Sequence, residues 1–168
     1  MNKKYKDIDK EKLDRVIFHC EMFMYGSNFP EYMENFGYGN NIPGEYNRFA
    51  GLHLISTMFL NKDRSEPKGQ KMYGLCYRLL KPMNLNKLLL PIEEILNKKI
   101  GNTTFGNCIK ETRTNYATHG KFNFEDLSDE VKKIRQVHKH HFALFMEEFV
   151  IEVGTLLEKL ENIRKKIE

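Results

Sequence analysis

The sequence predicts an all-α fold, and three observations carry that prediction. Apolar residues recur at intervals of three and four positions along most of the chain, which places them on one face of a helix. Runs that alternate apolar and polar residues, the sign of half-buried strands, are scarce. The chain also closes with an apolar stripe of helical spacing that extends from Phe142 to Ile167.

Length and composition indicate a single domain over residues 1–168. A chain of 168 residues with 40% apolar and 30% charged residues can bury a core without disulfides or metals. We expect no membrane span, because no run of 18 apolar residues exists, and no secretion signal, because no apolar segment follows the basic start. Three scattered cysteines without C-x-x-C spacing predict buried, reduced thiols in the cytoplasm: Cys20, Cys76 and Cys108.

The first helix is expected over about residues 9–25, and an irregular passage rich in Gly, Asn, Pro and aromatic residues follows it over residues 26–44. Two interpretations of this passage stay open. It is either a loop that binds a partner or covers a substrate, or an excursion between helices pinned by its aromatic residues, and the second is preferred. The apolar face of the first helix consists of Leu13, Val16, Ile17, Cys20, Phe23 and Met24.

Three more helices are expected in the middle of the chain, over about residues 45–61, 68–80 and 86–99. Pro82 should interrupt the second of these, and Pro91 should kink or restart the third, because proline lacks a backbone N–H. Histidines among apolar residues in the first two helices of the chain are expected to be hydrogen-bonded core residues: His19 and His53. Packing residues of helix 45–61 are expected to be Phe49, Leu52, Ile55, Ser56, Met58 and Phe59.

The sequence Gly101-Asn102-Thr103-Thr104 breaks the chain, and either threonine can cap the next helix. That helix should end at His119-Gly120, and the last helix should begin at Ser128 and run without interruption to near the C-terminus. Its apolar stripe is longer than a small bundle needs, so we expect its end to meet a second subunit. The capped helix carries Phe105, Cys108, Ile109, Thr112 and Tyr116 on its apolar face.

Arg113, Asn115 and His119 are the strongest candidate site residues. Arginine binds phosphate with a planar fork of donors, and histidine transfers protons near neutral pH. Asn115 and His119 share a helix face, whereas Arg113 lies about 120° away from His119 in azimuth and about 9 Å along the axis. The three side chains converge if the helix loosens before Gly120, which a glycine permits.

RNA cleavage without a metal needs a base for the 2′-hydroxyl, an acid for the departing 5′-oxygen and cations for the phosphorane. One chain offers one histidine in this segment, His119, and one arginine, Arg113. Two chains related by a two-fold axis would offer two of each and so a complete acid–base pair. The net charge of +4 is compatible with an anionic partner.

The spacing of Arg113 and His119, with five residues between them at a predicted helix end, resembles the R-x(4–6)-H motif of the HEPN superfamily. The stretch over residues 104–120 is also similar to HEPN sequences of the R-N-x-x-A-H-G type. The resemblance implies one up-and-down helical bundle over residues 1–168, which dimerises with its motifs facing a shared cleft. It further implies a metal-independent endoribonuclease of toxin or phage-defence type, without cofactor, that leaves 2′,3′-cyclic phosphates through Arg113, His119 and Asn115.

The partners implied by the resemblance are RNA, a second copy of the chain and an antitoxin or defence-system protein. The motif departs from the common pattern at Thr114, where Asn, Asp or His is usual, and at Lys121-Phe122, where some members carry Tyr. These departures leave an alternative open. The chain is then a non-catalytic HEPN-like module that binds a partner protein, RNA or nucleotide.

A second histidine group, His138, His140 and His141, admits three interpretations. The preferred one is a solvated basic face that continues from Lys132, Lys133 and Arg135. A metal site would need at least a third ligand from elsewhere in the chain. The third interpretation places His140 or His141 in the RNA cleft.

Overall fold

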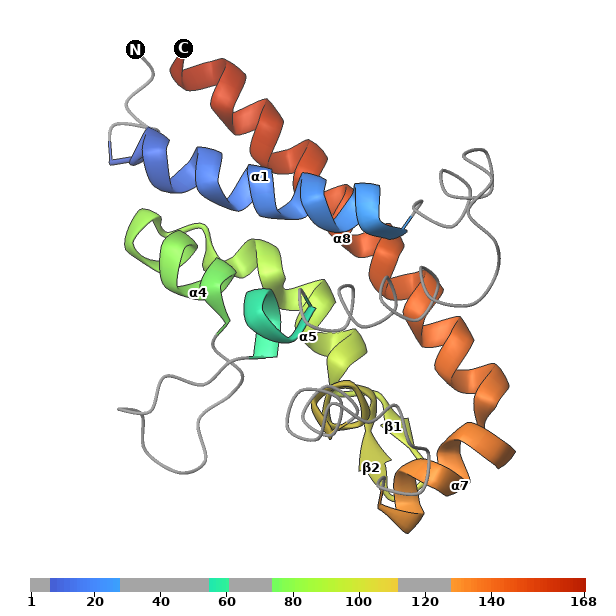
Figure 1. Cartoon of the computed structure of the whole chain (residues 1–168). Helices are drawn as coiled ribbons and strands as arrows, with labels where there is room; N and C mark the ends of the chain where they lie inside the picture. Colours follow the sequence, from blue (N-terminus) through green and yellow to red (C-terminus); the bar gives the residue numbers. More distant parts are fainter. Residues whose placement is uncertain (1–6, 28–54, 61–73, 112–127) are drawn as a thin grey trace.

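The computed structural model describes residues 7–27, 55–60, 74–111 and 128–168, and Figure 1 shows that helices dominate them. The all-α prediction is confirmed, and the described part contains one two-stranded sheet of two residues per strand. An unlabelled helix covers residues 105–111. The labelled elements are α1 (Lys10–Ser27), η2 (Ser56–Leu60), α4 (Leu75–Leu80), η3 (Lys81–Met83), η4 (Asn86–Leu89), α5 (Leu90–Leu96), β1 (Lys99–Ile100), β2 (Thr103–Thr104), α7 (Asp129–Val137) and α8 (Lys139–Ile167).

Helices α1 and α8 form an antiparallel pair along the molecule (Figure 1). Lys10 at the start of α1 forms an ion pair of 3.1 Å with Glu168 at the end of α8, and further along Phe23 meets Phe149 edge to face at 5.6 Å between ring centroids. An exposed ion pair contributes about 0–1 kcal/mol. Apolar burial between the two helices therefore provides most of their attraction.

The apolar faces predicted for the first and last helices meet in this pair. All predicted positions on α1 are buried except Met24, which is partly buried, and both ends of the α8 stripe are partly buried. The middle of the stripe packs on the main core, and the contact of its end with a second subunit stays a prediction. The fully buried members of the α8 stripe are Phe149, Val153, Leu156 and Leu160.

Helix α4 begins later than the predicted helix over residues 68–80, because Gly74 has extended backbone angles, φ −74° and ψ 179°. Gly74 lies against the backbone of η2, and a Cβ there would clash with the carbonyl oxygen of Met58. This close approach requires a glycine. The described part of helix 45–61 is buried as predicted, at Ile55, Ser56, Met58 and Phe59.

Pro82 and Pro91 affect the helices around them nearly as predicted. Pro82 lies in the first turn of η3, which continues the chain as a 3₁₀ helix until Asn84 adopts a left-handed φ of 57°. Pro91 lies in the first turn of α5, where its missing N–H is harmless, so the helix restarts there. The predicted extension of this helix to residue 99 is wrong, because α5 ends at Leu96 and Lys99 belongs to β1.

The predicted break at residues 101–104 is a β-hairpin in which Ile100 pairs with Thr103. Gly101 takes a left-handed φ of 60° in the turn. The predicted threonine cap is Thr104, whose Oγ1 accepts a hydrogen bond of 3.3 Å from the backbone N–H of Asn107. The helix over residues 105–111 buries its predicted apolar positions Phe105, Cys108 and Ile109.

The final helix is not continuous, and this corrects the sequence prediction. It begins at Asp129 as expected, but it bends at His138, whose φ of −110° and ψ of 21° separate α7 from α8. The bend lets Ile134 of α7 pack with Ile100 and Cys108, while α8 keeps its own stripe on the main core. Phe142 and Phe145 of α8 pack against both clusters and so connect the two on the α8 side of the bend.

Several predictions fall beyond the described part of the chain. They concern residues 28–44 of the irregular passage, residues 68–73, and the helix end at His119-Gly120, together with the individual residues Phe49, Leu52, His53, Thr112 and Tyr116. Within the described ranges, no helix combines the length and apolarity that a membrane span requires.

Candidate functional site

Arg113, Asn115 and His119 lie outside the described residues, so their arrangement stays a prediction. The structure does describe the residues on either side of the segment that carries them. The backbone N–H of Ser128, just before α7, donates a hydrogen bond of 2.9 Å to Oε1 of Glu111, the last described residue of the helix that begins at Phe105. The segment therefore leaves and rejoins the described fold at adjacent points.

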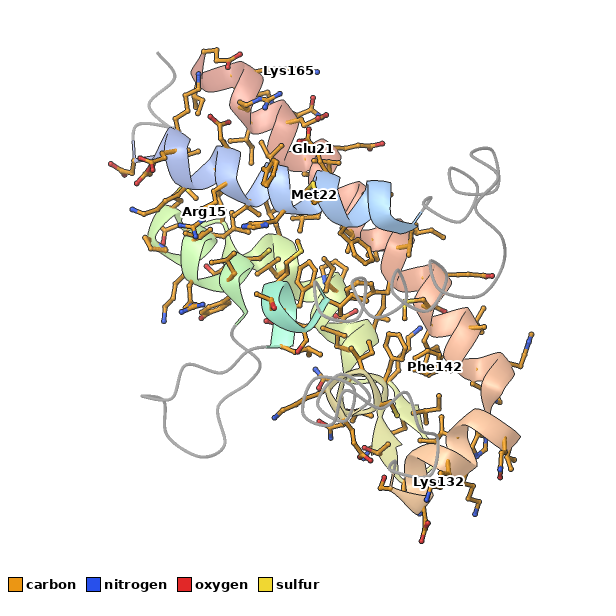
Figure 2. The ribbon with its side chains drawn as sticks, in the orientation of Figure 1. Arg15, Glu21, Met22, Lys132, Phe142 and Lys165 are labelled. Carbon is orange, nitrogen blue, oxygen red and sulfur yellow. The ribbon has the colours of Figure 1, made fainter. Side chains whose placement is uncertain are left out.

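Helix 105–111, which leads into the candidate segment, is fixed to α8 by aromatic contacts. The buried ring of Phe105 meets Phe142 at 5.1 Å, Phe145 at 5.9 Å and Phe149 at 6.4 Å between centroids, each edge to face. Figure 2 shows Phe142 on the part of α8 that lies near α7. Such aromatic pairs stabilise the fold by about 0.5–1.5 kcal/mol each beyond area burial, so they hold the helix before Arg113 against α8.

The three clustered histidines straddle the bend between α7 and α8. His141 lies 5.9 Å from His138 and 6.3 Å from His140 between ring centroids. His140 and His141 are exposed, which agrees with the preferred solvated-face interpretation, whereas His138 is half-buried. In the described ranges, no three His, Cys, Asp or Glu side chains are grouped so that they could bind a metal ion.

A surface cavity of about 220 Å³ lies between the hairpin turn and α7. Its described lining consists of Gly101, Asn102, Lys133, Ile134 and His138. Sequence reasoning did not predict this site, because Gly101-Asn102 is expected there only as a break and no interpretation joins Lys133 or His138 to it. A two-residue Gly-Asn connection between short segments is itself a hairpin signal and could have pointed to the turn.

Two other lysines of this part of the chain form ion pairs with residues of α7 and α8. Lys132 pairs with Asp129 at 3.7 Å, and Lys98 forms an ion pair with Glu148. Figure 2 places Lys132 on α7, near the far end of the molecule from the chain termini. Lys133 is exposed and, within the described part of the chain, has no acidic partner. The cavity thus carries a net positive charge among its described lining residues.

The cysteines are free and buried, as predicted. A hydrogen bond with the Cys20 thiol, followed by burial, raises the pKa of Cys76 well above its usual value. Cys76 therefore stays a protonated thiol, and it lacks the thiolate character of a nucleophile.

His19 differs from its prediction as a core residue. It is half-buried on α1, and its ring meets the exposed ring of Phe18 at 5.7 Å. Partial burial, and secondarily the charge of Arg15, lower the pKa of His19 below its ordinary value of 6.5. His19 is therefore a surface residue whose protonated form is disfavoured.

Comparison of the chain with protein-family models, with curated proteins and with solved structures finds no match.

Proposed function

We propose that the protein is a metal-independent endoribonuclease of toxin or phage-defence type, acting in the cytoplasm as a homodimer. The observation that carries the proposal is the Arg113-x5-His119 spacing with Asn115 between them, which resembles the HEPN motif. The all-α fold with its long C-terminal helix supports it, because the resemblance implies that architecture.

The chemistry follows from the residue types. In this proposal one His119 removes the proton of the ribose 2′-hydroxyl, and the 2′-oxygen attacks the adjacent phosphorus. The equivalent histidine of a second copy protonates the departing 5′-oxygen. Arg113 stabilises the negative charge that grows on the phosphorane oxygens, and Asn115 positions the phosphate. The products are a 2′,3′-cyclic phosphate and a 5′-hydroxyl.

The direct test is cleavage of varied RNAs, structured and unstructured, by the purified chain in EDTA. We expect fragments with 2′,3′-cyclic phosphate ends, and light scattering should give about twice the chain mass of 19.9 kDa. Activity that EDTA abolishes would refute the metal-independent route. A strict monomer at high micromolar concentration, with and without RNA, would remove the composite site.

The alternative is a non-catalytic module that binds a partner protein, RNA or nucleotide through the same residues. Thr114, in place of the usual Asn, Asp or His, favours this alternative. The two functions separate in one comparison. If wild type cleaves no RNA but retains a partner that Arg113→Ala loses, the segment is a docking surface.

A further inference from the structure

We propose that the cavity between the β1–β2 turn and α7 binds a phosphate group, with Lys133 and His138 as its principal ligands. No part of the proposed nuclease site is needed for this inference, because every residue it uses lies in the described part of the chain.

The shape of the cavity suits a small anion. Its volume of about 220 Å³ accommodates a phosphate with part of the group that bears it. The base includes Ile134, which is 2% exposed and packs with Ile100 and Cys108. Because this side of the cavity belongs to a packed cluster, the turn and α7 are held at a fixed separation.

The charge of the cavity favours an anion over a cation. Lys133 supplies a full positive charge, and two acids of α7 and α8 are engaged by other lysines, Asp129 by Lys132 and Glu148 by Lys98. An ammonium group is a compact cation with three donors, well suited to phosphate oxygens. The ammonium of Lys133 at the cavity would repel a metal ion.

His138 adds a second donor. It is the N-cap residue of the 29-residue helix α8, yet its side chain makes no capping hydrogen bond. Its imidazole is therefore available to the cavity that it lines.

The binding test is an amide and histidine-ring NMR titration of the full chain with inorganic phosphate. We expect saturable shifts centred on Gly101, Asn102, Lys133 and His138. Lys133→Ala and His138→Gln should each weaken binding about tenfold, the loss of one charge-assisted hydrogen bond. Matched controls on exposed residues outside the described lining, Lys159→Ala and His140→Ala, should leave the affinity within twofold of wild type.

Three ligands distinguish the sources of the phosphate. Tighter binding of a 2′-O-methylated oligoribonucleotide than of inorganic phosphate assigns the cavity to RNA, and tighter binding of 5′-AMP assigns it to a nucleotide. Binding of inorganic phosphate alone assigns it to the free ion. Since none of these ligands is cleaved, the result does not depend on the nuclease proposal.

The inference is overturned by either of two results. One is a phosphate response that sodium chloride reproduces at equal ionic strength. The other is equal weakening by Lys133→Ala and Lys159→Ala, which would show general surface attraction. Lys133 is exposed, so its alanine variant should fold, and thermal melting checks this.

Discussion

Ser128 and Glu111 are joined by a hydrogen bond of 2.9 Å from a backbone N–H to a carboxylate oxygen, although they are separated by 17 positions. This contact closes the segment that carries Arg113, Asn115 and His119. It connects a helix that packs on α8 through Phe105 with the start of α7. The segment that carries the candidate residues is therefore joined to described structure at both of its ends.

Glu111→Ala should loosen this closure. The bond is exposed, so the free energy of unfolding should fall by only about 0.5–1.5 kcal/mol, but exchange of the Ser128 amide proton with solvent should become faster. Hydrogen-exchange NMR measures the second effect. Glu111→Gln keeps an acceptor oxygen and should protect the amide better than alanine does. Equal protection in both variants and wild type would show that the contact has no role in solution.

Phe149 should be among the most costly side chains to remove. Its ring is fully buried and meets Phe23, Phe59 and Phe105 edge to face. Phe149→Ala should lower the free energy of unfolding by about 3–5 kcal/mol, as urea denaturation would show. Ile151, two residues away on α8 and 65% exposed, is the matched control, and its alanine variant should change stability by about 0.5 kcal/mol or less. Similar costs at both positions would contradict the orientation of α8.

Alanine substitution at Gly74 and at Gly154 should change the free energy of unfolding in opposite directions. Gly74→Ala places a Cβ against the backbone of Met58 and Phe59, so it should destabilise the fold by about 1–3 kcal/mol. Gly154→Ala lies inside α8, where the new Cβ meets Met24 Cε at an ordinary 3.5 Å, so it should stabilise by about 0.5–1 kcal/mol. Thermal unfolding distinguishes the two. A tolerated Gly74→Ala would show that α4 and η2 do not approach as described.

His19 should make stability depend on pH. Its pKa in the folded state is lowered, mainly by partial burial, so the unfolded state takes up the proton more readily. The free energy of unfolding is therefore not reduced by His19 above about pH 6.5, the pKa of histidine in the unfolded state. It falls as the pH drops below this value. His19→Gln, which does not titrate, should lose less stability than wild type between pH 7.5 and pH 5. Parallel melting profiles for the two proteins would contradict the lowered pKa.

Local pattern in the sequence was sufficient to predict the main helices. The faces of α1 and α8 repeat every three or four residues, and tertiary packing reinforces that repeat, so Leu13 and Phe149 are buried as expected. The bend at His138 left no such signal, since neither Gly nor Pro marks it. It accompanies the packing of Ile134 on Ile100 of the hairpin, a contact between distant parts of the chain.

The hairpin and the cavity were missed for related reasons. Strands of two residues are too short to show alternation, so the sequence predicts Lys99 as the end of helix 86–99 although it lies in β1. The cavity joins Gly101 with His138, and no local pattern encodes a contact over that separation. The Arg113, Asn115 and His119 site was predicted from motif spacing alone and stays a prediction.

The central claim is tested most directly by the rate of RNA cleavage in EDTA by wild type and His119→Ala. Loss of the proton-transfer group should reduce the rate by about 10²–10⁴. Arg113→Ala should be nearly inactive, and Arg113→Lys should recover little, because an ammonium group lacks the guanidinium fork. Cleavage by His119→Ala at the wild-type rate, with both proteins equally folded, would contradict the account.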